Sequence, residues 1–479
     1  MSDIPFALWT LVIALVGLTV LWCQPHRSWL CNALSKLQQT LWLPSESAGK
    51  ANLSIPTRQC PEKHATLPPG NSSASPSPRL TILVAGDTFS PDVNGAAIFT
   101  LQLAAGLAHL GHKLHVIVPS INGIPGVFEE NHGGAKIIIH RLRSVRWTFL
   151  TSLRCAVPWE VRTDVSLIMN LVKPDIVHIQ SFFQIGRGVA REAYVRNIPI
   201  VATNHFLPEN ANDCTWFGKG IIWLGLNFLL ADAARTYHLV DTITAPTKKA
   251  AMNLERTMHL GGNSVKSISC GIHIRDCTAK PGRPRLNEII FVGRLAPEKQ
   301  LNILLLAFHL LPPELDARLR IVGNGVMLAN LQTLARQLEI AERVTFAGHV
   351  SEVQKYDALT NATLFVMPST AELQSLSCLE AMASGLPLVV ADAMALPHLI
   401  NGNGYLFEPG NEIDLAKKLT DILAVSEQEY IRMSSLSRAM VHDHDIHKTL
   451  QAYEAIYYTL FQDRGLQREI EDTRKLLHS

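Results

Sequence analysis

The sequence lacks several patterns on which common protein functions depend. Its eight cysteines are scattered, with no C-x-x-C pair and no cysteine–histidine spacing typical of zinc, so we expect reduced thiols and no structural metal. The formal net charge is only +2 over 479 residues, which argues against nucleic acid as a partner. The motif at Gly323 and Gly325 falls short of G-x-G-x-x-G, which argues against a nicotinamide cofactor and favours a tight strand-to-helix turn.

Charged residues are absent from the run FALWTLVIALVGLTVLWC, which spans Phe6 to Cys23. Its length is close to the ~20 residues that cross a bilayer, so we expect a single transmembrane anchor within residues 1–26. A signal peptide and a buried helix are the alternatives, but Asp3 replaces the usual basic start of a signal peptide. Arg27 and Lys36 follow the run and favour a cytosolic body by the positive-inside rule.

Residues 27–78 are poor in features that build a core. The segment TLPPGNSSASPSPR is rich in Pro, Ser, Gly and Asn, a composition that cannot bury enough apolar surface to offset the entropy of ordering. We interpret residues 27–78 as a disordered tether between the anchor and the body.

The body alternates apolar runs typical of buried strands with helical patterns. A strand from Leu80 to Ala85, a helix from about Ala97 to Leu110 and a strand from Leu114 to Pro119 form the first β-α-β unit. The same alternation restarts after a Pro-, Gly- and charge-rich segment, Cys277 to Asn287. We therefore expect two parallel sheets with ligands beyond the carboxyl ends of their strands.

Candidate ligand-binding residues follow the predicted strands. A lysine near a helix start is disfavoured by the helix dipole, so Lys299 together with Arg294 predicts a bound anion, and we favour a diphosphate. The alternative is that Lys299 pairs with Glu298 or lies in solvent. Gly95 opens the first helix, where an anion could approach the backbone closely; the alternative is a glycine needed only for the turn.

The stretch TAELQSLSCLEAMASGLPLVV contains two glutamates. Glu380 lies in a predicted helix, Ser377 to Ser384, and Glu372 lies in the loop before it. A carboxylate accepts two hydrogen bonds and suits vicinal hydroxyls, whereas the backbone N–H groups of residues 373–375 (Leu373, Gln374 and Ser375) suit a phosphate. The array therefore predicts a nucleotide sugar, although Glu380 could also be an ordinary carboxylate near a helix start.

Several segments together resemble family-four retaining glycosyltransferases: PDVNGAA, GRLAPEK, IVGNG, and AELQSLSCLEAMASGLPLVV followed by NGYLFEPGN. The resemblance extends from about Leu80 to the C-terminus, and TNHFLPEN and ELQSL are most similar to bacterial-type glycolipid mannosyl- and glucosyltransferases. It implies an α/β fold of GT-B architecture, in which two Rossmann-like domains face a cleft. The expected domains are residues 79–277 on the acceptor side, 278–445 on the donor side, and a helical segment, 446–479.

The resemblance also implies residue roles on the donor side. Arg294 and Lys299 would hold the donor diphosphate, Glu372 the sugar hydroxyls and Glu380 the ribose. Gln374 stands where many members have an aromatic residue followed by glycine, so the donor stays open between GDP-mannose and a UDP-hexose.

In the first domain, the resemblance places Gly95 against the diphosphate and His205 against the transferred sugar. Transfer would proceed by front-face attack with retention, and the cations would stabilise the leaving diphosphate. No D-x-D motif lies near these segments, so we expect no metal and no cofactor.

The acceptor is less sharply indicated. The segment HRLRSVRWTFLTSLRCAVPW interleaves arginines with aromatic residues, a composition suited to an anionic membrane surface. We therefore predict a membrane-facing surface formed by Arg141, Arg143, Arg146 and Trp147, and a lipid or glycolipid acceptor. A nucleotide-sugar epimerase and a non-catalytic scaffold subunit are the alternatives.

Overall fold

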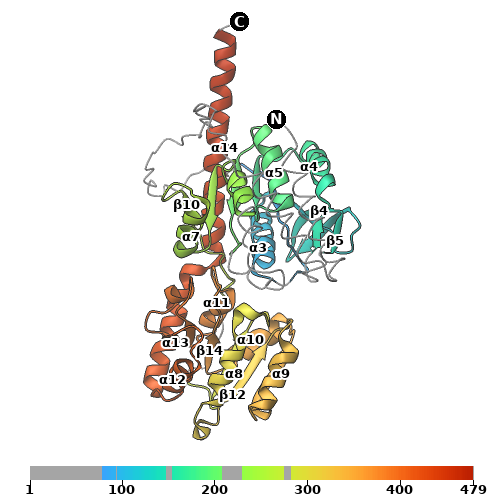
Figure 1. The fold of residues 1–479 in the computed structure, drawn as a ribbon. Helices are drawn as coiled ribbons and strands as arrows, with labels where there is room; N and C mark the ends of the chain where they lie inside the picture. The colour runs from blue at the N-terminus through green and yellow to red at the C-terminus, as the bar shows by residue number, and fades with distance from the viewer. Residues whose placement is uncertain (1–77, 93, 147–153, 208–228, 275–281, 478–479) are drawn as a thin grey trace, which may run out of the picture. The chain divides into compact units, whose positions relative to one another are not determined.

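The computed structural model describes residues 78–92, 94–146, 154–207, 229–274 and 282–477, with the side chains of 468–477 excluded. The predicted anchor, nearly all of the predicted tether, Trp147 and residues 208–228 lie outside these ranges. Residues 70–479 form one compact unit. It contains two separate, mainly parallel sheets with helices on both faces (Figure 1).

The first sheet has eight strands in the order β10-β9-β8-β7-β1-β2-β4-β3. All neighbours are parallel except β3 and β4. The strands are β1 (Thr81–Ala85), β2 (Lys113–Pro119), β3 (Gly126–His132), β4 (Ala135–Leu142), β7 (Ile176–Ile179), β8 (Ile200–Thr203), β9 (Thr242–Ala245) and β10 (Val265–Ser267). A small antiparallel pair, β5 (Ser144–Arg146) and β6 (Arg154–Ala156), follows β4.

Alternate residues of β1 supply two different cores, as the two-residue period of a strand requires. Ile82 and Val84 pack on one face with helix α3 (Gly95–His109). Leu83 and Ala85 pack on the other face, which is covered by α4 (Pro158–Val172), α5 (Gln184–Val195) and α7 (Lys248–Met258). Burial on both faces explains why these strands appear in the sequence as continuous apolar runs.

The second sheet has six parallel strands in the order β13-β12-β11-β14-β15-β16. They are β11 (Glu288–Val292), β12 (Arg318–Val322), β13 (Val344–Gly348), β14 (Leu364–Met367), β15 (Leu388–Ala391) and β16 (Gly404–Phe407). One apolar core joins this sheet to its helices, which are α8 (Leu301–His309), α9 (Leu328–Gln337), α10 (Glu352–Asn361), α11 (Leu376–Ala383), α12 (Glu412–Leu423) and α13 (Glu427–Val441).

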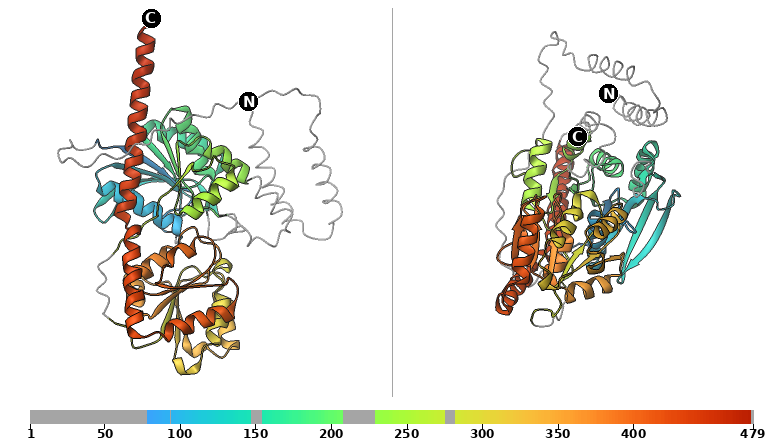
Figure 2. Two further views of the ribbon diagram at one scale, coloured as in Figure 1. Left: turned by 90° about the vertical axis from the view of Figure 1, so that its left-hand side faces the viewer. Right: turned by 60° about the horizontal axis from the view of Figure 1, so that its bottom comes forward.

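Helix α14 (Ile446–Leu477) begins after the second sheet but contributes to the core of the first. Figure 2 shows it as one long, continuous helix. Tyr457 Oη lies 2.6 Å from Nδ1 of His178 on β7, and Tyr453 Oη lies 3.0 Å from the hydroxyl of Thr203 on β8. These buried polar contacts fix α14 against the middle of the first sheet.

The glycines of the I-V-G-N-G segment have the structural role that the sequence predicts. Gly323 has a φ of +133°, and a Cβ there would collide with the backbone of Gly293. A Cβ on Gly325 would collide with the backbone of Leu295. Both glycines therefore allow close backbone packing at a turn after β12.

Candidate active site

Lys299 and Glu372 form an ion pair beyond the carboxyl ends of strands in the second sheet. Lys299 ends a short 3₁₀ helix, Pro297–Lys299, after β11, whereas Glu372 lies in the loop between β14 and α11. Their side chains are only 16% and 12% exposed. The alternative that Lys299 pairs with Glu298 or lies in solvent is wrong, because its partner is Glu372.

Arg294 pairs instead with Glu298, with 2.7 Å between Nη2 and Oε1. The arginine side chain is 55% exposed and the glutamate side chain 8%. The Thr370 amide and the Ser369 hydroxyl both donate to the Glu298 carbonyl. Glu298 thus ties the Arg294 loop to the Glu372 loop and leaves the rest of the guanidinium accessible.

Glu380 on α11 has a partner that the sequence analysis missed. Lys355 Nζ on α10 lies 2.8 Å from Glu380 Oε1 and 3.0 Å from Glu352 Oε1. Burial alone would lower the pKa of Lys355, but the charges and hydrogen bonds of these two carboxylates raise it above its ordinary value. Both predicted ligand-binding glutamates are therefore largely buried and paired with a lysine.

The loop before α11 has backbone donors available for a ligand. Ser375 caps the helix by accepting a bond from the Cys378 amide. Among the described residues, no acceptor bonds to the N–H groups of Leu373, Gln374 or Ser375. These three amides and the positive end of the helix dipole suit an anion.

The Gln374 side chain is committed to internal contacts. Its Oε1 accepts a bond from the Cys270 amide at 2.8 Å, and its Nε2 donates to Ser269 Oγ at 2.9 Å. The neighbouring Leu373 carbonyl accepts from Thr247 Oγ1 at 2.9 Å. Gln374 thus anchors the glutamate loop, which explains a buried polar residue at a position where the resemblance leads one to expect an aromatic residue.

In the first sheet, His205 follows β8 and Gln180 follows the neighbouring β7. His205 Nε2 lies 3.0 Å from Gln180 Oε1, and Gln180 Nε2 is buried without a partner in the described structure. The His205 ring lies 5.1 Å from the Phe99 ring, measured between centroids. Burial lowers the pKa of His205 to about 4, so at neutral pH it is an uncharged hydrogen-bonding group.

Gly95 is the first residue of α3, and the Asn94 side chain caps that helix by accepting from the Ala97 amide. A Cβ on Gly95 would meet nothing within 4 Å. Packing within the described structure therefore does not require glycine here, and the open space leaves room for a ligand at the helix start.

The predicted membrane-facing arginine surface needs a correction. Arg141 lies on β4, is only 7% exposed, and donates to the carbonyls of Ser90 at 2.8 Å and Pro119 at 3.3 Å. Arg143, whose side chain is 58% exposed, pairs loosely with Glu160 at 3.5 Å. Arg146 on β5 is exposed, and Trp147 lies outside the described residues.

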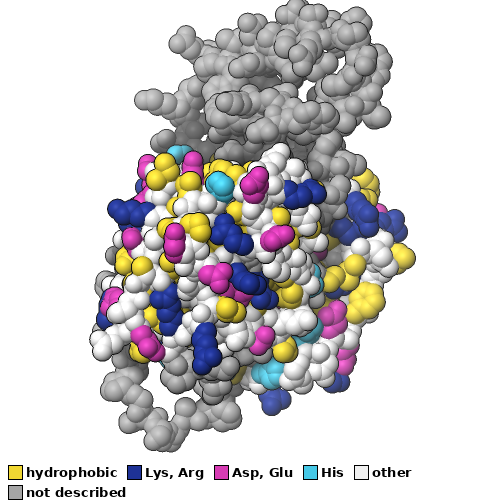
Figure 3. All heavy atoms as spheres, turned by 90° about the horizontal axis from the view of Figure 1, so that it is seen from below, with side chains coloured by type: hydrophobic (Ala, Val, Ile, Leu, Met, Phe, Trp, Pro, Cys, Tyr) yellow, Lys and Arg dark blue, Asp and Glu magenta, His cyan; other side chains and the backbone are white. Residues whose placement is uncertain are grey.

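Within the described ranges, no three His, Cys, Asp or Glu side chains gather in a way that could hold a metal ion. Burial raises the pKa of the Cys155 and Cys270 thiols to about 12, and both cysteines are free. The face in Figure 3 carries Lys and Arg interspersed with Asp and Glu. In the same ranges, no helix combines the length and apolarity needed to cross a membrane.

Comparison with known proteins gives this geometry a class. Residues 93–276 match the model for "Glycosyltransferase Family 4", and residues 278–437 match the model for "Glycosyl transferases group 1". An uncharacterized glycosyltransferase of Methanocaldococcus jannaschii is 33% identical over 358 residues, which is 69% of this chain and 86% of the relative.

Several relatives carry functional names. A "GDP-mannose-dependent alpha-mannosyltransferase" of Mycolicibacterium smegmatis is 29% identical over 323 residues, covering 66% of this chain and 80% of the relative. The "Alpha-monoglucosyldiacylglycerol synthase" of Streptococcus pneumoniae is 25% identical over 361 residues, covering 70% of this chain and 77% of the relative. Among solved structures, sucrose-phosphate synthase from Thermosynechococcus elongatus superposes with a TM-score of 0.65 at 18% identity, covering 80% of this chain and 99% of that one.

The fold is that of a glycosyltransferase with the GT-B architecture. The chain belongs to glycosyltransferase family 4. This result confirms the predicted α/β fold and enzyme class, and it favours transfer over the epimerase and scaffold alternatives.

Proposed function

We propose that this enzyme transfers a hexose from a nucleotide sugar to a lipid or glycolipid acceptor, with retention of the anomeric configuration. The observation that carries the proposal is the arrangement beyond the second sheet: Arg294, the Lys299–Glu372 pair, and the bare amides at the start of α11. A nucleoside diphosphate carries the charge that these donors complement, and its ribose and sugar carry hydroxyls for the two glutamates.

The chemistry follows from where charge develops. When the bond between the sugar and the diphosphate breaks, negative charge grows on the leaving oxygen, and Arg294, Lys299 and the α11 amides stabilise it. Glu372 holds Lys299 in place and offers its second oxygen to a sugar hydroxyl. In front-face attack the leaving phosphate oxygen takes the acceptor's proton. This matches a neutral His205, which orients the sugar without acting as a base.

The donor is proposed as GDP-mannose or a UDP-hexose. The M. smegmatis relative is named for GDP-mannose, which supports the first choice. The test is to incubate membranes containing the protein with a panel of UDP- and GDP-sugars and to identify the lipid product by mass, then its anomeric configuration by NMR. An inverted product would refute retention, and no sugar transfer to any lipid would refute the lipid acceptor.

A lipid acceptor is supported by an apolar surface in the first domain. Four large apolar side chains between β2 and β4 are exposed by 49–66%: Ile121, Ile124, Val127 and Phe128. Two of them lie on β3, an edge strand of the sheet, and exposed Arg143 and Arg146 follow β4. Such a combination of apolar and basic groups suits an anionic membrane surface. The S. pneumoniae relative is also named for a diacylglycerol lipid.

We further propose that the run from Phe6 to Cys23 anchors the chain as a single-pass membrane protein with its catalytic body in the cytosol. Deleting residues 1–69 leaves the compact unit of residues 70–479 whole. The truncated protein should fold, bind nucleotide, and associate with anionic vesicles at low salt but not at high salt. Serine at Arg143 and Arg146 should weaken that association, and a truncated protein that stays membrane-bound in high salt would refute the anchor.

A further inference from the structure

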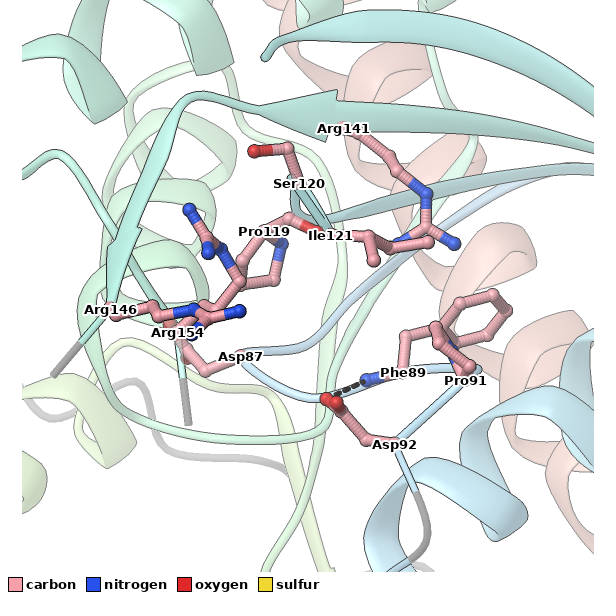
Figure 4. Close-up of a pocket in the computed structure, with 10 residues that line it drawn as sticks. All are labelled: Asp87, Phe89, Pro91, Asp92, Pro119, Ser120, Ile121, Arg141, Arg146 and Arg154. Carbon is pink, nitrogen blue, oxygen red and sulfur yellow. Dashed lines mark hydrogen bonds between the residues drawn. The ribbon is translucent and has the colours of Figure 1, made fainter. Parts of the chain in front are cut away.

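A cavity of about 240 Å³ lies at the carboxyl edge of the first sheet. Its walls come from the loop after β1, the end of β2 and the strands β4, β5 and β6 (Figure 4). Three arginines line it: Arg141, Arg146 and Arg154. Its volume is below the roughly 300–1,000 Å³ typical of sites for drug-sized ligands, so it suits a single small group.

Two of the arginines are held in place by hydrogen bonds to neighbouring groups. Arg141 is bonded to the carbonyls of Ser90 and Pro119, and its nearest carboxylate, on Glu130, lies 3.5 Å away. Arg154 donates from Nε to Ser144 Oγ and from Nη2 to the Ser144 carbonyl, both at 2.8 Å. The Arg146 side chain has no hydrogen bond or ion pair with any residue that the structure describes. Arg141 therefore has a carboxylate partner in Glu130, whereas Arg146 and Arg154 have none among the described residues.

The acidic residues of the cavity do not cancel this charge. Asp87 accepts bonds from the Ser181 hydroxyl and from the Ile185 amide at 3.1 Å, which commits it to the start of α5. Asp92 accepts from the Phe89 amide at 3.4 Å. Burial raises the pKa of both carboxyl groups. With Glu130, which pairs with Arg141, three carboxyl groups lie near the three guanidiniums. None of them pairs with Arg146 or Arg154 in the described structure, so these two cations are available to an anionic ligand.

The cavity adjoins the place where sugar transfer is proposed. Strand β1 lies between β2 and β7, so the loop after β1 separates the cavity from Gln180 and His205. A Cβ on Gly86, directly before Asp87, would lie 3.7 Å from Cβ of Gln180. A molecule bound in the cavity would thus lie along the same sheet edge as the His205 side chain.

We infer that this arginine cavity binds a phosphate group carried by the acceptor, and so positions the acceptor's hydroxyl for glycosylation. The planar, fixed donors of arginine match phosphate oxygens in a bidentate manner. The inference rests on the proposed function, because it names the chemistry of the acceptor for the same reaction. The phosphate can belong to a lipid headgroup or to a soluble phosphorylated molecule, and the experiment separates these sources.

Binding is to be measured on the full chain in neutral detergent by calorimetry, in the presence of a nucleoside diphosphate. The soluble probes are glycerol phosphate and glycerol, and the lipid probes are micellar phosphatidylglycerol and diacylglycerol. The first variant is Arg146→Gln, because the Arg146 side chain is exposed and unpaired in the described structure. The second is Arg141→Lys, which keeps the positive charge but loses the planar guanidinium that can bind phosphate in a bidentate manner. Arg143→Gln is the matched control, since it removes an arginine two positions away that does not line the cavity.

We expect the phosphate-bearing probes to bind more tightly than their neutral counterparts. Arg146→Gln and Arg141→Lys should weaken that binding by roughly tenfold or more, the loss expected when a charge-assisted hydrogen bond is removed. For the soluble probe glycerol phosphate, Arg143→Gln should bind within about twofold of the wild type, because a distant exposed charge is screened. Melting temperature and nucleotide affinity should not change in Arg146→Gln.

The inference is overturned if glycerol phosphate and phosphatidylglycerol bind no better than glycerol and diacylglycerol, or if Arg143→Gln weakens binding of glycerol phosphate as much as Arg146→Gln does. If glycerol phosphate alone binds in an Arg146-dependent manner, the cavity is confirmed and its ligand is soluble, which removes the lipid acceptor of the proposed function. Glycosylation of neutral diacylglycerol without dependence on Arg146 would leave the proposed function standing and refute the cavity.

Discussion

Replacing Lys299 with methionine should both destabilise the protein and weaken nucleotide binding, for separable reasons. The Lys299 and Glu372 side chains are 16% and 12% exposed, so the substitution leaves a nearly buried carboxylate without its partner. Removing one partner of a buried ion pair lowers the free energy of unfolding by about 3–5 kcal/mol, and because this pair is partly exposed we expect the lower value, about 3 kcal/mol. For a domain of this size that corresponds to a melting temperature lower by about 6–12 °C.

The double variant Lys299→Met/Glu372→Gln separates structure from binding. Glutamine removes the unpaired charge, so the melting temperature should return to within about 3 °C of the wild type, or roughly 1 kcal/mol. Affinity for the free nucleoside diphosphate should stay about 10–100-fold weaker in both variants, since a contact of about 1.5–3 kcal/mol with a charged group is lost. The assays are differential scanning fluorimetry and calorimetry with UDP and GDP.

The control is Lys417→Met, which removes an exposed lysine of α12. It should change neither the melting temperature nor the affinity for the nucleoside diphosphate. Recovery of nucleotide affinity in the double variant would refute the reasoning, because Lys299 would then act only by neutralising Glu372. An unchanged melting temperature in the single variant would show that the ion pair is not important for the fold.

Three further outcomes are expected. Glu380→Gln should weaken binding of the free nucleoside diphosphate as well as the intact donor, whereas Glu372→Gln should spare the free nucleotide; calorimetry with the reverse order would show that the two roles are exchanged. Gly95→Ala should leave the melting temperature unchanged, because its Cβ meets nothing within 4 Å, yet reduce donor affinity; full activity would show that no ligand approaches that helix start. Burial lowers the pKa of His178 to about 3 and that of His205 to about 4. As the pH drops from about 6.5 to 4, the two histidines therefore take up protons in the unfolded chain before they do so in the folded protein. The free energy of unfolding should fall over this range by up to about 1.4 kcal/mol per pH unit for each residue. Urea unfolding of His178→Gln should show a shallower pH dependence than the wild type, and an equal slope would contradict the assignment.

Much of the fold could be predicted because its strands are buried on both faces. The predicted strand from Leu114 to Pro119 lies within β2, Lys113–Pro119, and the predicted helix from Ser377 to Ser384 differs by one residue from α11, Leu376–Ala383. Continuous apolar runs and terminal glycines such as Gly385, with a φ of +78°, are local signals. Such signals are sufficient to predict strands, helices and helix ends, because these elements depend mainly on residues that are close in the sequence.

The candidate site depends on distant residues, and here the sequence was a weaker guide. The Lys299–Glu372 pair joins positions 73 apart, and the Lys355–Glu380 pair joins positions 25 apart. No periodicity links such partners, so Lys355 was missed. The basic-aromatic composition around Arg141 predicts an exposed surface, because composition cannot show that Arg141, Arg146 and Arg154 line a cavity while Arg143 does not.

The packing of α14 against the first sheet has a consequence for how the chain is synthesised. The hydrogen bond between His178 and Tyr457 spans 279 positions, and α14 starts after every strand that the structure describes. At translation rates of about 5–20 residues per second, the ribosome needs on the order of 15–55 s after His178 to reach Tyr457. During that interval the first sheet lacks helix α14. Apolar side chains such as Val84 and Val116, which share a core with Tyr457 of that helix, are then not covered by it. The nascent first domain is therefore a natural client for chaperones, and shortened chains that end before Ile446 would expose an aggregation-prone face.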